Sequence, residues 1–174
     1  MKLTPVMQKY ILHWGEMGSR WGVNRSVAQI QALLYLSPEP MPAEDIAEIL
    51  GIARSNVSNS LKELQNWGLV QVTHVLGDRR DHFQSKKDVW EMVTTIMDGR
   101  KRREIDPTIG FLRECVSDLK NDRETPAEVK ARIEAFLEFT EEVSGWYDKI
   151  KKMPRTTLLK LIRMGSTVSK VLGG

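Results

Sequence analysis

The chain has 174 residues, of which 41% are hydrophobic and 28% are charged. This composition is typical of a soluble globular protein, and the length allows one substantial core or one small domain with an appended helical part. No uninterrupted apolar run is long enough to span a bilayer, and the formal net charge of +3 is too small to indicate nucleic-acid binding by itself.

Two features of the sequence lead us to expect a cytoplasmic protein. Residues 1–10 lack the long apolar core of a signal peptide. Cys115 is the single cysteine, which excludes an intrachain disulfide and suits a reducing compartment.

Charge is distributed unevenly along the chain. Residues 54–87 hold six cations and three acids, residues 121–148 hold eight acids and three cations, and residues 149–174 hold seven cations and no acid. The first region has the positive excess that phosphate binding requires. The last two suggest helices that neutralise each other, within one chain or between two chains.

Two helices are expected before the first break in the chain. Residues 4–18 have a helical spacing of apolar residues, and Gly15 and Gly18 are expected to weaken the end of that helix. Asn24 is suited to cap a second helix over residues 25–36. The apolar face of the first helix would carry Val6, Tyr10, Trp14 and Met17.

A proline-rich link separates these helices from the next pair. Three prolines between Pro38 and Pro42 exclude regular helix there. Pro42 can occupy the first turn of the following helix, where its missing N–H does no harm.

Residues 44–67 predict a helix-turn-helix, the element around which the rest of the chain is organised. The first helix ends at Gly51, because glycine enters a left-handed C-cap without steric cost. The second helix has Val57, Leu61 and Leu64 at the spacing of a buried stripe.

The outer face of this second helix is unusually polar. It carries short hydrogen-bonding side chains with a cation near either end, which suit groove edges and phosphates. An ordinary solvated helix would carry more Glu and Lys, because Ser and Asn are mediocre helix formers. The alternative is a plain helical hairpin with a polar face. The candidate DNA-reading residues are Arg54, Ser55, Asn56, Ser58, Asn59 and Lys62.

A β-hairpin is expected directly after the helix-turn-helix. Residues 69–76 and 82–85 read as strands, and residues 77–81 form a charged tip that begins with glycine. Such a hairpin is the wing of a winged helix. We expect Arg79 or Arg80 to enter the minor groove while a flanking aspartate holds its guanidinium, the alternative being a solvated turn.

The second half of the chain is expected to form long helices. One begins at Val89 with Asp88 as its cap, is kinked or interrupted at residues 106–107 because a residue before proline disfavours the helical region, and resumes to about residue 120. A second runs from Pro126 to about Met153 behind a Thr125 cap, and a last one covers about residues 156–172. Their apolar faces lack a partner in a small winged-helix core, so we expect a homodimer, which also supplies a second DNA half-site.

Five segments together carry a resemblance to a known family. They are residues 17–22, 42–50, 55–64, 77–81 and 100–107. On these the chain resembles the MarR superfamily and, within it, the branch typified by GbsR; the likeness covers residues 17–115, and beyond them only the helical character is shared. The resemblance implies a homodimeric, ligand-responsive transcription regulator, often a repressor, that contacts DNA through the residues named above and one wing arginine.

The resemblance also implies a class of effector. Some members of this branch are similar in sensing quaternary ammonium compounds through an aromatic cage. At helical spacing, however, aromatic residues are core residues more often than cage walls, so the effector stays unassigned. The aromatic residues available for a cage are Trp14, Trp21, Trp90, Trp146 and Tyr147.

The sequence offers little support for metal binding, a cofactor or catalysis. His13, His74 and His82 are scattered without metal-ligand spacing, and neither a phosphate loop nor a catalytic triad nor paired carboxylates in an apolar setting is present, so we expect no metal, no cofactor and no enzyme activity. Cys115 is either a redox switch or a small buried residue.

The sequence therefore predicts a mainly α, α+β winged-helix protein with three parts. Residues 1–22 would form an N-terminal dimerisation helix, residues 23–87 the winged helix-turn-helix domain, and residues 88–174 a helical dimerisation and possible effector region. The predicted function is sequence-specific binding of double-stranded DNA in transcription regulation. The alternatives are a winged-helix module that docks a protein and never reads DNA, and contact of the basic C-terminal helix with a membrane, which its acidic neighbour disfavours.

Overall fold

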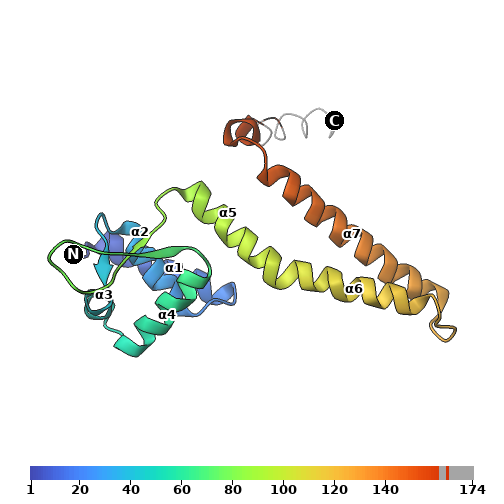
Figure 1. Cartoon of the computed structure of the whole chain (residues 1–174), viewed down its shortest axis with the longest axis horizontal. Helices are drawn as coiled ribbons and strands as arrows, with labels where there is room; N and C mark the ends of the chain where they lie inside the picture. Colours follow the sequence, from blue (N-terminus) through green and yellow to red (C-terminus); the bar gives the residue numbers. More distant parts are fainter. Residues whose placement is uncertain (161–163, 165–174) are drawn as a thin grey trace. The chain divides into compact units, whose positions relative to one another are not determined.

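The computed structural model describes residues 1–160 and 164. The chain divides into two compact units, Met1–Gly99 and Arg100–Gly174 (Figure 1). Residues 155–160 are helical, as expected for the start of the last predicted helix, and the rest of that prediction lies outside the described residues except for residue 164. The domain boundaries that the sequence suggests remain a prediction.

The first unit is built from helices that enclose one apolar core. Its largest fully buried side chains come from three of these helices, which therefore fix one another's positions. They are Ile30, Leu33, Leu34, Ile46, Val57, Leu61 and Leu64. The helices are α1 (Pro5–Arg20), α2 (Arg25–Leu36), α3 (Ala43–Leu50) and α4 (Arg54–Asn66), and α5 (Val89–Arg100) follows the sheet.

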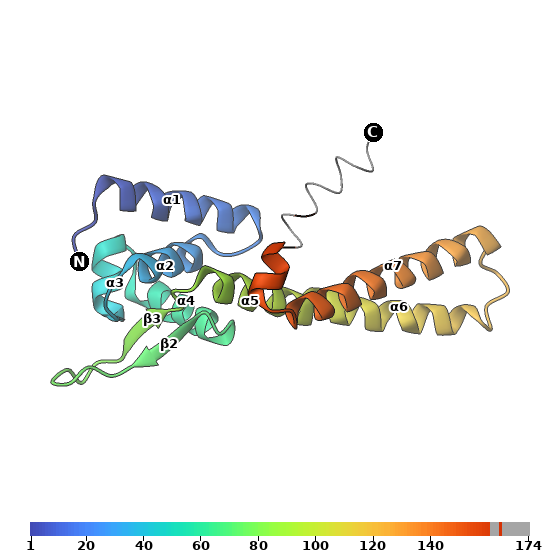
Figure 2. The ribbon, with the colours of Figure 1, turned by 90° about the horizontal axis from the view of Figure 1, so that it is seen from above.

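A three-stranded antiparallel sheet accompanies these helices, with the strand order β1-β3-β2. The outer strand β1 is Met41–Pro42, β2 is Val70–Thr73 and β3 is His82–Ser85. The loop between β2 and β3 projects away from the helices (Figure 2). The predicted fold class, a mainly α winged helix followed by long C-terminal helices, is confirmed.

Two details of the hairpin region differ from the prediction. The first strand is shorter than residues 69–76, because the backbone leaves the sheet after Thr73 and Gly77 takes a left-handed φ of 87°. Pro42 is the N-cap of α3 instead of a residue in its first turn, since it also pairs with His82 in the sheet. Proline fits this edge position because it has no N–H to donate to a further strand.

The helix ends follow the residues that the sequence offered as caps. Asn24 Oδ1 accepts a hydrogen bond from the Ser26 N–H at 2.8 Å, and Asp88 Oδ1 accepts one from the Glu91 N–H at 2.9 Å. Gly51 has a φ of 63°, the left-handed conformation expected at the end of α3.

The predicted apolar face of α1 is only partly the face that the core covers, because Trp14 packs half-buried against the core while Val6 and Tyr10 are exposed. Ile11, Gly15 and Gly18 are its buried residues, whereas Val6 is 77% exposed. The two glycines do not weaken the helix end, which continues to Arg20; they let α1 approach α2 closely. A Cβ on Gly18 would lie 2.4 Å from Ala28 Cβ, closer than any normal contact.

The second unit contains an antiparallel pair of helices that lie side by side (Figures 1 and 2). They are α6 (Asp106–Leu119) and α7 (Ala127–Lys151), and the π-helical segment η1 (Lys101–Ile105) precedes α6. The irregularity expected near Pro107 is therefore the π-helical segment that precedes α6. Pro107 itself lies in the first turn of α6, where its missing N–H breaks no helical hydrogen bond.

Ion pairs and a lysine bridge fasten α7 to its neighbours. Lys101 Nζ lies 3.5 Å from an Asp148 carboxylate oxygen, and Arg113 Nη2 lies 2.6 Å from Glu141 Oε1. Lys130 Nζ donates to the Leu119 carbonyl oxygen at 3.0 Å. These contacts identify the face of α7 that meets α6 and η1.

The predicted Thr125 cap of α7 was wrong by one residue. Pro126 is the N-cap, and no side chain caps the helix. Instead, Asp122 Oδ1 accepts a hydrogen bond from the Glu124 N–H at 2.7 Å, and the carboxylate also receives the Thr125 N–H. These bonds lower the pKa of Asp122 and order the turn before the helix. Within residues 1–160 and 164, no helix has both the length and the apolar character needed to cross a membrane.

Candidate nucleic-acid interface

Helix α4 has one buried face and one open polar face. Val57, Leu61 and Leu64 are buried in the core of the first unit, which fixes the rotation of the helix about its axis. The opposite face exposes four of the predicted DNA-reading residues on one stripe, with a spacing of three or four residues. They are Ser55, Ser58, Asn59 and Lys62.

The same stripe continues past the predicted residues. Gln65 and Asn66 are exposed and follow Lys62 at the same helical spacing. The sequence analysis missed them, although their period would have revealed them. The open face of α4 thus presents amides, hydroxyls and one ammonium group over about three turns.

Asn56 differs from its neighbours because it is half-buried and bonded within the unit. Its Nδ2 donates to Ser26 Oγ at 2.9 Å, and its Oδ1 lies 3.5 Å from the Ser60 hydroxyl. These contacts join α4 to the start of α2. A substitution at Asn56 therefore changes the packing of α4 as well as its surface.

Arg54 begins α4 and forms an ion pair with Glu44 of α3. The Arg54 side chain is 72% exposed, so solvent screens the pair and its contribution to stability is small. The pair holds the guanidinium at the N-terminal end of α4.

In the wing loop, the Asp78 carboxylate accepts several hydrogen bonds from Arg80. Arg80 Nη2 donates to Asp78 Oδ2 at 2.6 Å, Arg80 Nε donates to Asp78 Oδ1 at 3.0 Å, and the Arg80 N–H also reaches Oδ1 at 3.0 Å. These bonds hold the pKa of Asp78 well below its usual range and raise the pKa of Arg80. Such a two-point pair fixes the plane of the guanidinium.

Two further residues contact the ion pair of Asp78 and Arg80. Arg80 Nη1 lies 3.4 Å from Asp45 Oδ1 of α3. The buried His82 places Nδ1 2.9 Å from the Arg80 carbonyl oxygen and Nε2 3.4 Å from Asp78 Oδ2. The sequence analysis recognised neither residue as a partner of the wing arginine or of Asp78. His82 could have been suspected from its position at the start of the second strand, whereas Asp45 lies 35 residues from Arg80 and no local pattern indicates it.

Arg79 has a different setting from Arg80. Its side chain is exposed, and within the described residues it forms no hydrogen bond or ion pair. Asp78 and His82 hold only its neighbour. Arg79 therefore keeps its charge and its donors available to solvent.

Not every cation of the basic region is available for phosphate. Lys87 Nζ donates to the carbonyl oxygens of Leu34 at 2.7 Å and Tyr35 at 3.0 Å, and it also bonds that of Ser37. Burial lowers the pKa of Lys87. Lys86 Nζ lies 3.3 Å from Glu91 Oε1, so this ammonium is already paired with a carboxylate. The positive excess counted from the sequence is therefore smaller at the candidate interface than it first looked.

The aromatic residues expected for an effector cage are divided between the two units. Trp14 stacks on Tyr10 with ring centroids 5.9 Å apart, and Trp21 and Trp90 belong to the same unit. Trp146 and Tyr147 lie on α7 in the second unit. The cage remains a prediction.

Metal-ligating side chains and the single cysteine are the remaining candidates for reactive groups. Among residues 1–160 and 164, no group of three His, Cys, Asp or Glu side chains is placed to hold a metal ion. Cys115 is half-buried on α6. Its role as a redox switch remains a prediction.

The chain is similar in sequence to known transcription regulators. The model of the MarR family matches residues 21–81. The chain is 23% identical over 136 residues to the HTH-type transcriptional repressor GbsR of Bacillus subtilis (strain 168), a match that covers 76% of this chain and 75% of the relative. It is 16% identical over 135 residues to the putative HTH-type transcriptional regulator YvaV of the same organism, with 76% of each chain covered.

A similar fold also occurs among solved structures. A protein described as a transcriptional regulator aligns with a TM-score of 0.60 and 16% sequence identity. The alignment covers 83% of this chain and 99% of that one, so it includes more than the winged helix.

Proposed function

We propose that the chain is a GbsR-like member of the MarR superfamily and a sequence-specific DNA-binding transcription regulator, a ligand-responsive repressor that acts as a homodimer. The observation that carries the proposal is the open polar face of α4 next to a wing arginine that is already held in place. The GbsR relative is named a transcriptional repressor, which supports repression of transcription as the role proposed for this chain.

Each subunit would place α4 in a major groove. Asn59 and Ser58 are the side chains we assign to base edges, because they are exposed and have no partner within the described part of the chain. Lys62 and Arg54 would contact phosphates at the flanks of the groove, with Ser55 beside them. Asn56 would act chiefly by holding α4 against Ser26.

The wing would contact the adjoining minor groove. We assign that contact to Arg80, since Asp78 and Asp45 hold its guanidinium and a pre-oriented arginine loses little entropy on insertion. Arg79, which has no ion pair in the described residues, would pair with a phosphate instead.

The regulatory part of the proposal concerns the distance between two such units. A two-fold dimer presents two α4 helices to half-sites about one helical turn of DNA apart. An effector that binds better to a dimer with a different spacing would release the DNA. We include the cytoplasm as the location, because the regulator has to meet chromosomal DNA, and we assign no enzyme activity, because the function needs no catalytic group.

A selection experiment tests this function. Fragmented genomic DNA is bound to the full-length protein, and the enriched fragments are sequenced and returned as duplexes for fluorescence anisotropy. We expect a pseudo-palindromic site, and Asn59→Ala should reduce the preference for it. Glu134→Ala, a change at an exposed position of α7, is the control and should leave the preference intact. Binding without any site preference would contradict the proposal.

A second candidate function is a winged helix that docks a protein. Leu76 at the tip of the wing loop is fully exposed and Val75 beside it is 41% exposed, so the tip offers an aliphatic anchor of the kind that interfaces use. Leu76→Ser separates the candidates. A DNA-reading wing should retain site preference after this change, whereas a docking wing should lose its protein partner.

A further inference from the structure

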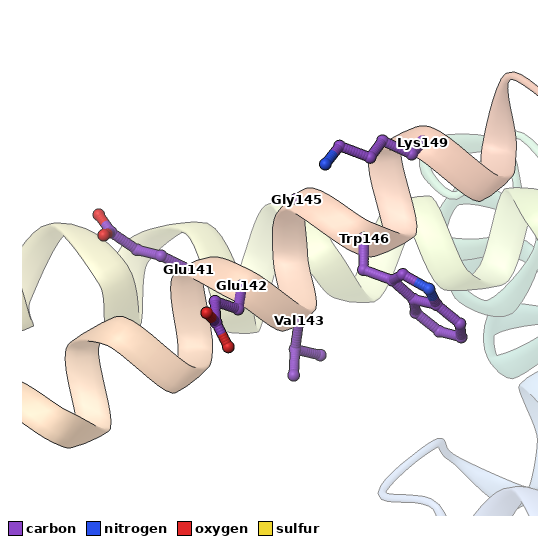
Figure 3. Close-up of a pocket in the computed structure, with 6 residues that line it drawn as sticks. All are labelled: Glu141, Glu142, Val143, Gly145, Trp146 and Lys149. Atoms are coloured by element: carbon purple, nitrogen blue, oxygen red, sulfur yellow. The ribbon is translucent and has the colours of Figure 1, made fainter.

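Helix α7 has an exposed apolar stripe on the side away from α6. The face toward α6 is marked by Lys130, Glu141, Ser144 and Asp148, which are buried or bonded to the neighbouring helix and η1. The opposite face carries Phe136, Phe139, Val143 and Trp146, of which Trp146 is 65% exposed. Figure 3 shows Val143 and Trp146 projecting from the same side of the helix.

The spacing of this stripe is that of a coiled-coil seam. Its members follow one another at alternating steps of three and four residues, which is the heptad repeat of helices that pack along their length. Half-buried Ile150 continues the same repeat in the last turn of α7, which ends at Lys151. We call the set of Phe136, Phe139, Val143, Trp146 and Ile150 the α7 seam.

An exposed apolar seam of this length marks an interaction surface, and the charges beside it indicate what covers it. Glu142 and Lys149 flank the seam on the same edge, seven residues apart, and both are exposed without an ion pair in the described residues. In a helix, residues seven apart are about 10 Å from each other along the axis, so these two charges do not satisfy each other within one chain.

We propose that the α7 seam packs antiparallel against the same seam of a second copy of this chain, with Val143 opposite the partner's Trp146. This register places Phe139 opposite the partner's Ile150. Each of these layers thus joins an aromatic side chain to an aliphatic one. The same arrangement repeats on the other side of the two-fold axis.

The register also satisfies the flanking charges. Where Val143 faces the partner's Trp146, Glu142 lies beside the partner's Lys149, and the symmetry makes the pair twice. A parallel, in-register packing would instead bring Trp146 against the partner's Trp146 and leave Glu142 without a cation. Charged residues at these flanking positions select the partner and its orientation in coiled coils, so the charges favour the antiparallel dimer.

This inference rests on the proposed homodimer and adds to it the surface and the register. It makes α7 an element that joins two subunits through the side not bound to α6.

Distances between spin labels test the register in the full-length protein. In a Cys115→Ser background, single labels are placed at Ala131→Cys and Glu138→Cys, both exposed and outside the seam. With a rise of about 1.5 Å per residue, the register predicts separations of about 40 Å at residue 131 and about 20 Å at residue 138. Equal, short distances of about 10 to 20 Å at both sites would show a parallel packing and overturn the proposal.

Charge reversal tests the same register without labels. Glu142→Lys and Lys149→Glu should each weaken the dimer about tenfold in a sedimentation measurement, because each brings like charges together twice. The double variant should restore the wild-type affinity. Glu138→Lys, on the same helix but off the flanking position, is the matched control. Failure of the double variant to restore dimerisation would also overturn the register.

The outcomes separate this inference from the proposed function. A dimer that prefers one DNA site but has other label distances would contradict the register and leave the function standing. A dimer with the expected distances but no site preference would support the seam and contradict the function. A monomeric protein would contradict both the seam and the proposed homodimer.

Discussion

Asp45 and Arg80 lie 3.4 Å apart, from a carboxylate oxygen of α3 to Nη1 of the wing arginine. The pair joins the first helix of the helix-turn-helix to the loop that would enter the minor groove. Glu44, the neighbour of Asp45, pairs in the same way with Arg54 of α4. The acids at the start of α3 therefore hold an arginine on each side of the candidate interface.

Replacing Asp45 should change how the wing meets DNA. In Asp45→Asn, Arg80 keeps only its contact with Asp78, and an acid close to the phosphates is removed, so affinity for any duplex should rise by about two- to fivefold while site preference falls. Fluorescence anisotropy on specific and scrambled duplexes measures both. Glu48→Gln, an exposed acid elsewhere on α3, is the control; an equal gain in that variant would show that only net charge matters.

The ionised Asp78 carboxylate should raise the free energy of unfolding at pH values above its ordinary pKa. Its pKa lies below the ordinary value of 3.8, so the folded protein gains stability from the ionised carboxylate above that value. As pH falls below about 4, the unfolded chain takes up the proton first and the gain is lost progressively toward the folded pKa. Urea denaturation of wild type and Asp78→Asn should differ by a constant amount from pH 5 to 7, and the difference should shrink below pH 4. A difference that grows in acid would contradict the assignment.

Gly18 is required for the packing of α1 on α2. In Gly18→Ala the new Cβ would lie 2.4 Å from Ala28 Cβ, so the helices must separate, and we expect a loss of about 1 to 3 kcal/mol in the free energy of unfolding. Glu16→Ala, at an exposed position of the same helix, should change it by no more than about 0.5 kcal/mol. Equal stability of the two variants in urea denaturation would refute the close contact.

Lys87 should support the fold more than it supports DNA binding. Lys87→Met removes an ammonium that bonds three carbonyl groups at the end of α2, and we expect a loss of about 1 kcal/mol in unfolding free energy. The salt dependence of DNA binding should stay unchanged. Lys86→Met is the control for the loss of one charge. A weaker salt dependence of DNA binding in Lys87→Met would show that this lysine contacts DNA phosphates.

The features that could be predicted from sequence are those that local rules determine. Gly51, Asn24 and Asp88 act as caps because the geometry of a helix end depends on a few neighbouring residues. The helix-turn-helix and the hairpin follow from spacing and turn residues in the same way. These elements supplied the architecture of the first unit.

The remaining features depend on contacts between residues far apart in the chain. The face that α1 buries is decided by the fit of Gly15 and Gly18 against α2, which hydrophobic periodicity does not report. The bond from Asn56 to Ser26 crosses 30 residues, and the one from Lys87 to Leu34 crosses 53. Residues that look like one polar face in sequence are therefore divided by the fold into surface and supporting groups.

The most direct test of the proposed function is the salt dependence of specific and non-specific DNA binding, measured by anisotropy for wild type, Arg80→Ala and Arg79→Ala. We predict a wild-type preference of at least about a thousandfold for the selected site. Arg80→Ala should reduce that preference, whereas Arg79→Ala should weaken binding to all duplexes and lower the salt slope by about one ion per wing. Equal affinity for selected and scrambled duplexes in the wild type, or no effect of either arginine, would contradict a winged-helix regulator that reads DNA.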